Sequence, residues 1–457
     1  MSAYLGSMKV WDSSGSPAPA EWVRPADWLQ MPEISPSEQK IVGLHAVHAD
    51  GNFCAFTIAG AFTVDWGDGV VENFASGATA YHEHSYTDAD LDGTESELGY
   101  KQALVTITPQ SGQNLTNVNF QVKHNKPGLV TGYATGWLDI SMSVPNCTAF
   151  TLGGSTVKHG LLQRFKFIAC GLITSLANTF SGCASLASVD LAPLAGAPIT
   201  SLVNAFSNCA SLPRVDLSAL AGAQVTTLSN AFYGCRSLAT IDLSPFDGAP
   251  INNITYTFQG CSSLVDIDLT PLAGAPITSL SSTFYNCHAL ASIDLTPLAG
   301  ALINNLSFTF FGCSSLSSLD LAPLAGAPVT TMTYMLQDCY ALAYVDLSPL
   351  AGAPITSLSN IFSGCSSLAE ADLTPFNGAP ITAISNAFYA CISLSSLKMP
   401  SPITFSVASC KLSAAALDAL YTSLPTVTGK TLTVTGNYGT TGHTPSIATA
   451  KGWTITV

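Results

Sequence analysis

Charged residues are scarce in this chain of 457 residues: they make up only 10% of it, and the net charge is −14. Surfaces that bind nucleic acid need clustered Lys and Arg, and here 15 basic residues face 29 acidic ones. Long apolar runs are also lacking, since none approaches the ~20 residues needed to cross a bilayer. We therefore expect neither a nucleic-acid partner nor membrane insertion.

A secretory signal is missing from the first residues. The segment MSAYLGSMKVWDSSGSPAPAEW has no charged stretch followed by an apolar one. We expect a protein that assembles in the cytosol before it acts outside a cell, as virion proteins do. The neutral, hydroxyl-rich composition suits a virion tail or, otherwise, an extracellular or cell-surface location.

The cysteines lack the spacing of a metal site. There are 13 of them, an odd number, and no CxxC pair occurs. This argues against a zinc site and against a framework of paired disulfides. Nine recur at one position of a repeat, which predicts small buried side chains rather than a catalytic thiol. These are Cys183, Cys209, Cys235, Cys261, Cys287, Cys313, Cys339, Cys365 and Cys391.

What the chain has in abundance is a repeat of 26 residues, present nine times between Ile173 and Pro400. The copy INNITYTFQGCSSLVDIDLTPLAGAP (251–276) shows its pattern. Alternation in L-x-x-I-D-L predicts a short strand, and strands stacked once per repeat form a parallel sheet on one face. The preceding I-x-x-L-x-x-x-F stretch is spaced like a helical turn. A Gly in each return loop indicates a turn with positive φ. The sequence predicts a solenoid.

Phenylalanine recurs once per repeat, with Leu336 in its place in one copy. Because this column is in phase with the other apolar columns, we expect the rings to stack inside the solenoid. An exposed aromatic platform for sugars is the alternative, and it is disfavoured.

An aspartate stands between the two apolar residues of each predicted strand and should point outwards. Stacked about 4.8 Å apart, such carboxylates repel one another. Hydrogen bonds from nearby Ser and Thr, with solvent and mobile cations, could offset the repulsion; the other interpretation is a face that binds a cation or a receptor. This acidic ladder comprises Asp190, Asp216, Asp242, Asp268, Asp294, Asp320, Asp346 and Asp372.

Two columns vary while the core columns do not, which is where a regular scaffold would bind a specific ligand. One lies beside the acidic ladder, and the other flanks the repeat cysteine. Tyr and Arg are favoured anchors in interfaces. Free variation of exposed positions would give the same diversity. The candidate binding residues are Arg214, Asp266, Tyr344 and Glu370 in the first column, and Tyr233, Tyr285 and Tyr340 in the second.

The repeat resembles the BspA-like leucine-rich repeats of bacteria. Their pattern A-F-x-x-C-x-x-L-x-x-I-x-L-P is seen here from Ala231-Phe232 to Leu243-Ser244-Pro245. The resemblance covers half of the chain, although this unit is longer by a P-L-A-G-A-P type loop. It implies an adhesin or a receptor-facing module.

The segment before the repeats resembles a PKD-type β-sandwich over residues 38–125. It carries Trp66-Gly67-Asp68-Gly69 and then His82-Glu83-His84-Ser85-Tyr86. This resemblance implies an Ig-like spacer or interaction domain without chemistry of its own. His82 and His84 are expected at strand ends rather than on a metal.

Between these motifs lies Asp88-Ala89-Asp90-Leu91-Asp92-Gly93, which opens like a calcium loop. The twelfth position is Gly99, where a bidentate Glu belongs. A solvated acidic loop is therefore favoured, with calcium on Asp88, Asp90 and Asp92 as the alternative. No other cofactor is expected.

The flanks complete a multidomain chain. Residues 1–37, rich in Trp and Pro, resemble leader segments of phage tail-associated proteins and are expected to be an attachment arm. Residues 126–172 should cap the first coil of the 173–400 array. Residues 401–457 should form a small α+β C-terminal cap, with a helix over 412–424 and strands over 431–435 and 453–457.

Together these features predict a structural adhesion protein without enzymatic activity, because no carboxylate pair or nucleophile is unique. The favoured function is a phage tail fibre or tail-tip receptor-binding protein. Its arm would contact other virion proteins and its solenoid a host surface protein or glycan. A homo-oligomer is compatible with this. The alternative is a bacterial surface or secreted BspA-like adhesin.

Overall fold

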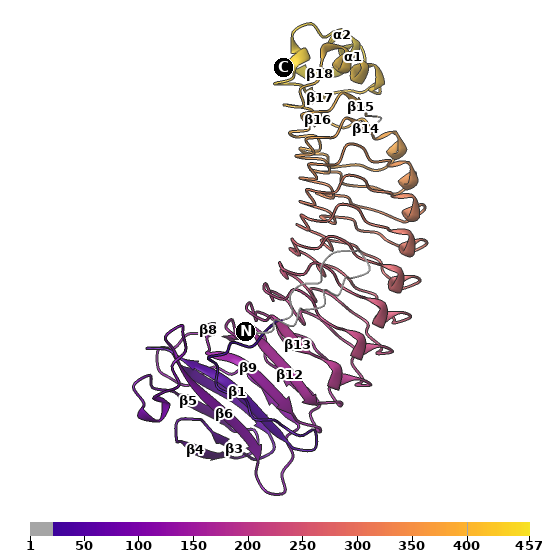
Figure 1. The fold of residues 1–457 in the computed structure, drawn as a ribbon. Coiled ribbons are helices and arrows are strands. Elements are labelled where there is room, and N and C mark those ends of the chain that lie inside the picture. Colours follow the sequence, from indigo (N-terminus) through magenta and orange to yellow (C-terminus); the bar gives the residue numbers. More distant parts are fainter. Residues whose placement is uncertain (1–21, 400) are drawn as a thin grey trace, which may run out of the picture.

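The computed structural model describes residues 22–399 and 401–457. Two β-sheets at the N-terminal end continue into a curved stack of coils, and a small unit with two α-helices closes the other end (Figure 1). One apolar core runs through all three parts, from Ile41 to Trp453. No helix in the described ranges has the length and apolar character needed to cross a bilayer.

The larger sheet joins the N-terminal region to the coils. Its strand order is β13-β12-β9-β1-β6-β3-β4. β1 pairs antiparallel with β6 and β9, whereas β12 pairs parallel with β9 and β13, so the sheet changes from antiparallel to parallel as it enters the first coil. The strands are β1 (Lys40–Val47), β3 (Phe62–Asp65), β4 (Val71–Phe74), β6 (Lys101–Pro109), β9 (Trp137–Ser143), β12 (Arg164–Ala169) and β13 (Ser188–Asp190).

The smaller sheet has the order β10-β7-β2-β5. Aromatic rings pack between the two sheets. The ring centroids of Phe56 and Trp66 are 5.6 Å apart, and those of Phe120 and Trp137 are 5.7 Å apart. A further pair, β8 and β11, is parallel. The bounds are β2 (Phe53–Ala59), β5 (Thr79–Glu83), β7 (Asn117–Asn119), β8 (Tyr133–Ala134), β10 (Ala149–Thr151) and β11 (Val157–Lys158), with a 3-10 helix η1 (Ala89–Leu91) between β5 and β6.

Residues 126–172 belong to both sheets rather than only to the end of the solenoid. β9 lies beside β1, and β10 lies beside β7. β12 then pairs with β13 of the first coil. Both sheets therefore extend beyond residue 125, where the β-sandwich was expected to end. The larger sheet is hydrogen-bonded directly to the first coil.

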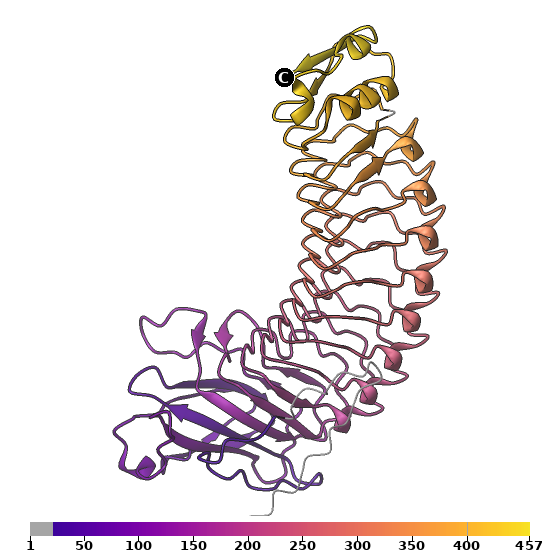
Figure 2. The same cartoon turned by 45° about the horizontal axis from the view of Figure 1, so that its top comes forward.

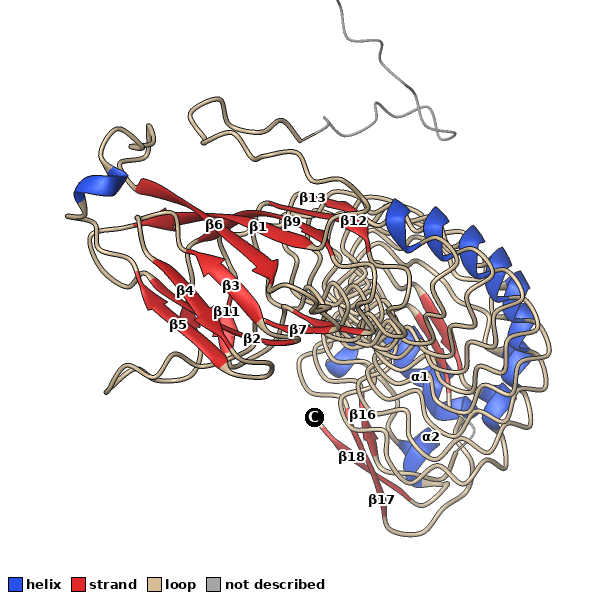
Figure 3. Ribbon diagram, turned by 90° about the horizontal axis from the view of Figure 1, so that it is seen from below, coloured by secondary structure: helices blue, strands red, loops and turns tan. Residues whose placement is uncertain are grey.

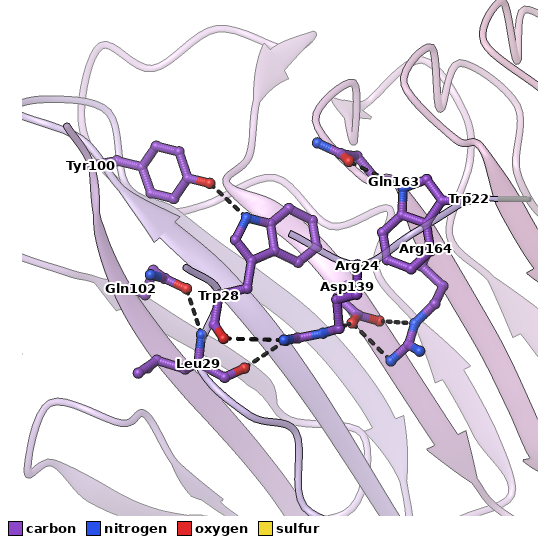
Figure 4. Close-up of polar contacts among 9 residues, drawn as sticks. All are labelled: Trp22, Arg24, Trp28, Leu29, Tyr100, Gln102, Asp139, Gln163 and Arg164. Atoms are coloured by element: carbon purple, nitrogen blue, oxygen red, sulfur yellow. Dashed lines mark hydrogen bonds and ion pairs between the residues drawn. The ribbon is translucent and has the colours of Figure 1, made fainter. Parts of the chain in front are cut away.

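The described part of the N-terminal arm, residues 22–37, packs on the outer face of the larger sheet (Figure 4). Trp28 Nε1 donates to the Tyr100 hydroxyl at 2.9 Å. Arg24 and Arg164 both pair with the fully buried Asp139, at 3.0 and 2.8 Å. Trp22 and Trp28 are thus occupied by the chain's own sheet, while Trp11 lies outside the described residues.

Each repeat forms one coil, numbered here from coil 1 at Ile173. As predicted, the Phe rings stack inside, with centroids 5.4–5.8 Å apart from coil 1 to coil 6. All nine repeat cysteines are buried. The eight thiols from Cys209 to Cys391 also donate to a backbone carbonyl of the preceding coil, as Cys261 Sγ does to Phe232 at 3.1 Å. The cysteine column therefore adds a further set of hydrogen bonds between neighbouring coils.

The helical segment of the coils does not lie where the spacing of the apolar residues predicted it. The I-x-x-L-x-x-x-F stretch forms successive turns, and a 3-10 helix forms instead at the S/T/A-P-L loop. Proline fits there because its fixed φ suits a helix start and its missing N–H is not needed. The 3-10 helices follow the convex edge of the stack (Figures 2 and 3). They are η2 (Ala192–Leu194), η3 (Ser218–Leu220), η4 (Ser244–Phe246), η5 (Thr270–Leu272), η6 (Thr296–Leu298), η7 (Ala322–Leu324), η8 (Ser348–Leu350) and η9 (Thr374–Phe376).

The predicted parallel sheet is regular only at the ends of the array, in β13, β14 (Glu370–Asp372) and β15 (Ser396–Lys398). In the middle coils the bonds between coils run along the Phe-containing turns, as from Phe232 N to Thr257 O at 3.0 Å. Because the array curves with the 3-10 helices on its convex edge, the coils diverge towards that edge. The backbone hydrogen-bond ladder is therefore kept along the Phe-containing turns and is reduced on the L-x-x-I-D-L side to single bonds, such as Val265 N to Ala239 O at 3.1 Å. The prediction of positive φ for the loop glycines, Gly196 to Gly378, is confirmed.

The C-terminal unit lies on coil 9, where α1 (Ala414–Ser423) packs against β15. Ser413 begins α1 by accepting a hydrogen bond from Ala416 N at 3.2 Å. A parallel sheet of order β16-β17-β18 follows. The remaining elements are β16 (Phe405–Ser406), β17 (Lys430–Thr433), η10 (Tyr438–Thr440), α2 (Ser446–Thr449) and β18 (Trp453–Thr456).

Candidate functional site

The acidic ladder has a structural role in every coil. In each of the eight aspartates, Oδ1 accepts a hydrogen bond from the backbone N–H two residues later, at 2.8–3.0 Å. That N–H opens the 3-10 helix, so the carboxylate caps it as an Asx turn does. Six of the eight residues are exposed, and Asp190 and Asp372 are half-buried.

Hydrogen bonds also offset the repulsion between the ladder's carboxylates. Side-chain and backbone hydrogen bonds from the residue two positions on lower the pKa of Asp216, Asp268 and Asp294. Lysine flanks the ladder at both ends, because Lys166 pairs in register with Asp190 and Lys398 with Asp372. Lys398 Nζ lies 2.8 Å from Asp372 Oδ2. Contacts within the chain therefore explain how the repulsion between the ladder's carboxylates is offset.

The Asp88 loop holds an ammonium group at the place of a cation. Lys101 Nζ lies 2.5 Å from Asp92 Oδ1 and donates to the backbone carbonyl of Asp88 at 3.1 Å. Asp88 Oδ1 in turn accepts from Asp90 N at 3.1 Å and begins η1. The three carboxylates therefore do not converge on a common point. They do not form the set of ligands that the calcium alternative requires.

A buried group of His45, Cys54 and His84 lies between the two sheets, with ligand atoms within 4.8 Å of one another. Gly136 N donates to His45 Nε2 at 3.1 Å, which leaves the ring hydrogen of His45 on Nδ1. His84 Nε2 donates to Trp66 O at 2.9 Å, so only its Nδ1 carries a free lone pair. One imidazole lone pair and one thiol are fewer ligands than a zinc site uses.

The remaining histidine of this motif, His82, has structural contacts. Its ring stacks on Trp66 at 4.5 Å, and its Nε2 lies 2.5 Å from Asp68 Oδ2. His82 is in β5, and His84 follows that strand directly. The W-G-D-G and H-E-H segments thus meet across the two sheets as packing partners.

The variable column beside the ladder is spread over the array. Arg214 lies in coil 2, Asp266 in coil 4, Tyr344 in coil 7 and Glu370 in coil 8. Only Tyr344 and Glu370 are on adjacent coils, and Glu370 is half-buried while the other three are exposed. The structure does not bring these four residues together.

The column that flanks the cysteines does form a site. A groove of about 450 Å³ opens across coils 3 to 5, and Asn208 of coil 2 also lines it. Tyr233 and Arg236 of coil 3 form one wall, and Tyr285 and His288 of coil 5 form the other. The floor, from coil 4, is Gln259, Gly260 and Ser262. We call these seven residues the central groove. Tyr340, also predicted from this column, lies two coils beyond it.

An aromatic patch continues from the central groove along the coils. Tyr285 stacks on Phe311 with centroids 4.5 Å apart, and Phe308 stacks on Tyr334 at 4.6 Å. The two stacks touch, with Phe308 and Phe311 6.2 Å apart. All four rings are half-buried. Tyr285 belongs to both features, so the groove and the patch form one surface.

Sequence reasoning missed Phe308 and Tyr334. They stand in a column where the outer coils have Asn, at Asn178, Asn204, Asn230, Asn360 and Asn386. Every residue of this column has a positive φ of 54–60°. Asn adopts that conformation readily, but a bulky side chain does so at a cost, and such strain tends to cluster at functional sites. The change from Asn to an aromatic residue was the available signal.

The comparisons with known proteins concern the repeats. No curated protein matches the sequence. The BspA type leucine rich repeat region matches it with six copies in three overlapping stretches, at residues 177–299, 229–349 and 280–410. These stretches include the acidic ladder from Asp190, the central groove and the aromatic patch. Because they span about half of its length, the chain belongs to the BspA type leucine-rich repeat family.

Proposed function

We propose that this chain is an adhesion protein without enzymatic activity, and that it recognises its ligand through the central groove. Family membership supports a surface role in adhesion or protein interaction. One observation carries the choice of site: bulky and cationic side chains gather in coils 3 to 7, where most outer coils have Ser, Ala or Asn in the same columns. Tyr389 and Ile392 of coil 9 are the exceptions.

The chemistry of the repeats supports a binding role over a catalytic one. Burial raises the pKa of all nine repeat thiols, which keeps them protonated and unreactive. Each ladder carboxylate has the same backbone contact as the next, so no pair is set apart as an acid and a nucleophile.

For the finer assignment we favour a phage tail fibre or tail-tip protein, with residues 1–37 contacting other virion proteins, over a bacterial surface adhesin. The resemblance of the arm to tail-associated leaders supports this. Mass spectrometry of purified phage particles and of cell envelopes from the source strain separates the two. Peptides of this chain in particles support the virion assignment, and their restriction to envelopes contradicts it.

Adsorption of the labelled full-length protein to a panel of whole bacterial cells tests the binding role. We expect the double variant Tyr233→Ala/Tyr285→Ala to lose most adsorption, because both walls of the central groove lose their rings. The matched control is Tyr344→Ala/Glu370→Ala on the ladder face, which should adsorb normally. If the two variants adsorb equally, or if the wild type adsorbs to no cell, the proposed function is wrong.

A further inference from the structure

The central groove has the form of a slot with matched walls. Residues two coils apart, in the same columns of the repeat, lie on either side of a coil that has smaller side chains: Tyr233 and Tyr285 flank Gln259, and Arg236 and His288 flank Ser262. Gly260 keeps the floor low. A Cβ at Gly234 of coil 3, where φ is 69°, would lie 2.6 Å from Asn208 Oδ1, so a larger residue there would displace the Asn208 amide. The slot is therefore built by the choice of residues in three consecutive coils.

We propose that this slot binds a glycan that carries a carboxylate, such as a uronic or sialic acid residue, with its sugar ring between Tyr233 and Tyr285. This proposal rests on the proposed function and adds the chemical class of the ligand.

The aromatic walls favour a sugar because the C–H face of a pyranose packs on a flat ring. Planar polar groups that can bond vicinal hydroxyls lie beside the walls, in Asn208, Asn286 and Gln259. The amide of Gln259 adds one more donor and acceptor group to the lining of the groove.

The charge of the slot favours an acidic sugar. Residues 173–399 contain only three basic side chains, Arg214, Arg236 and Lys398, and one histidine, His288. Two of these four groups, Arg236 and His288, line the slot, in a chain with a net charge of −14. Arg binds carboxylates through two parallel hydrogen bonds. Arg236 is exposed and has no ion pair among the described residues, so its guanidinium is available.

The imidazole of His288 is held in place for such a ligand. Its Nδ1 lies 2.8 Å from Gly312 O, which can only accept, so the ring hydrogen is on Nδ1. In the neutral ring, Nε2 is left as an acceptor for a sugar hydroxyl. Beyond this wall the aromatic patch offers Phe311, Phe308 and Tyr334 to further sugars along the coils.

A glycan array probed with the full-length protein tests the ligand class, followed by titration calorimetry with the oligosaccharides it selects. We expect selection of glycans with a uronic or sialic acid. Arg236→Gln should weaken binding about tenfold or more, since a charge-assisted pair is lost. Tyr285→Ala should weaken it as strongly. The controls Arg214→Gln and Tyr344→Ala, on the ladder face, should leave the affinity unchanged.

Three results would overturn the proposal. Selection of neutral glycans, with Arg236→Gln binding normally, would contradict the carboxylate. Adsorption to cells that needs the groove but survives periodate oxidation and is removed by protease would identify a protein ligand, leaving the proposed function intact. Adsorption that is indifferent to groove variants would remove both proposals. Equal melting temperatures of the variants and the wild type would exclude misfolding as the cause.

Discussion

The N-terminal sheets and the coils stabilise one continuous core in different ways. The sheets join segments far apart in sequence, as where Ile41 pairs with Ile107, and they enclose ionisable groups such as His45 and Asp139. The coils bond to their neighbours through backbone groups, thiols and stacked rings. In the coils, Lys398 with Asp372 is the one ion pair that the described residues make. We therefore expect pH to change the stability of the sheets as a whole. In the coils, we expect a substitution to destabilise only the coils next to it.

The largest expected difference is the response to acid. Six of the eight histidines lie between residues 45 and 159. Burial lowers the pKa of His45 well below its usual range and lowers that of His84 and of His159 to about 4. Above pH 6.5 folded and unfolded chains both hold these rings neutral. As the pH falls from 6.5 to 4, only the unfolded chain gains protons, so the sheets lose stability, by roughly 3 kcal/mol for His159 alone.

Urea unfolding at pH 7 and at pH 4.5 measures this loss. Five of the six tryptophans lie at or before residue 137, so fluorescence reports mainly on the sheets. His159→Gln should reduce the pH dependence, and His288→Gln in the coils should not. Equal stability of the sheets at the two pH values would contradict the comparison.

The next effect is local damage in the coils. Phe258→Ala removes one ring from the internal stack, which should cost about 3–5 kcal/mol. Because each coil contacts only its neighbours, amide exchange should accelerate in coils 3 to 5 and stay unchanged in β1 and β6. Hydrogen exchange followed by mass spectrometry shows this. Faster exchange across the sheets would mean that the two regions unfold together.

A smaller effect tests the ladder as a set of caps. Asp268→Ala should cost about 1 kcal/mol, because the N–H that opens η5 loses its acceptor. Asp268→Asn keeps an acceptor oxygen and should cost less, while it removes a charge from the ladder. Thermal unfolding of both variants decides between the roles. Equal destabilisation by Ala and Asn would show that charge, not capping, is what the coil needs.

The smallest effect should be a gain in stability. Tyr256 has a φ of 60° and is 41% exposed, in the column where outer coils have Asn. Tyr256→Asn should stabilise the coils by up to about 1 kcal/mol, because Asn tolerates the left-handed conformation. The shift in the unfolding midpoint in urea is the readout. A destabilised variant would show that the tyrosine ring contributes packing that outweighs its backbone strain.

Sequence reasoning predicted the repeat, its Phe and Cys columns, the loop glycines and α1, because each depends on local pattern. It misplaced the helical piece, since the spacing of Leu228 and Phe232 suits stacked turns as well as a helix. It also extended the parallel sheet through all coils, because the pattern of L-x-x-I-D-L does not reveal coil spacing. The central groove could be predicted only in part: Tyr233 and Tyr285 stood out, but the pairing of Arg236 with His288 needed the coil geometry.

We propose that recognition lies at the central groove and not on the acidic ladder. Hydrogen exchange of the full-length protein, with and without a saturating uronic or sialic oligosaccharide, locates the ligand directly. We expect slower exchange in 233–236, 259–262 and 285–288, with exchange in the ladder segments 266–270 and 292–296 unchanged. Protection of the ladder segments with none at the groove would contradict it.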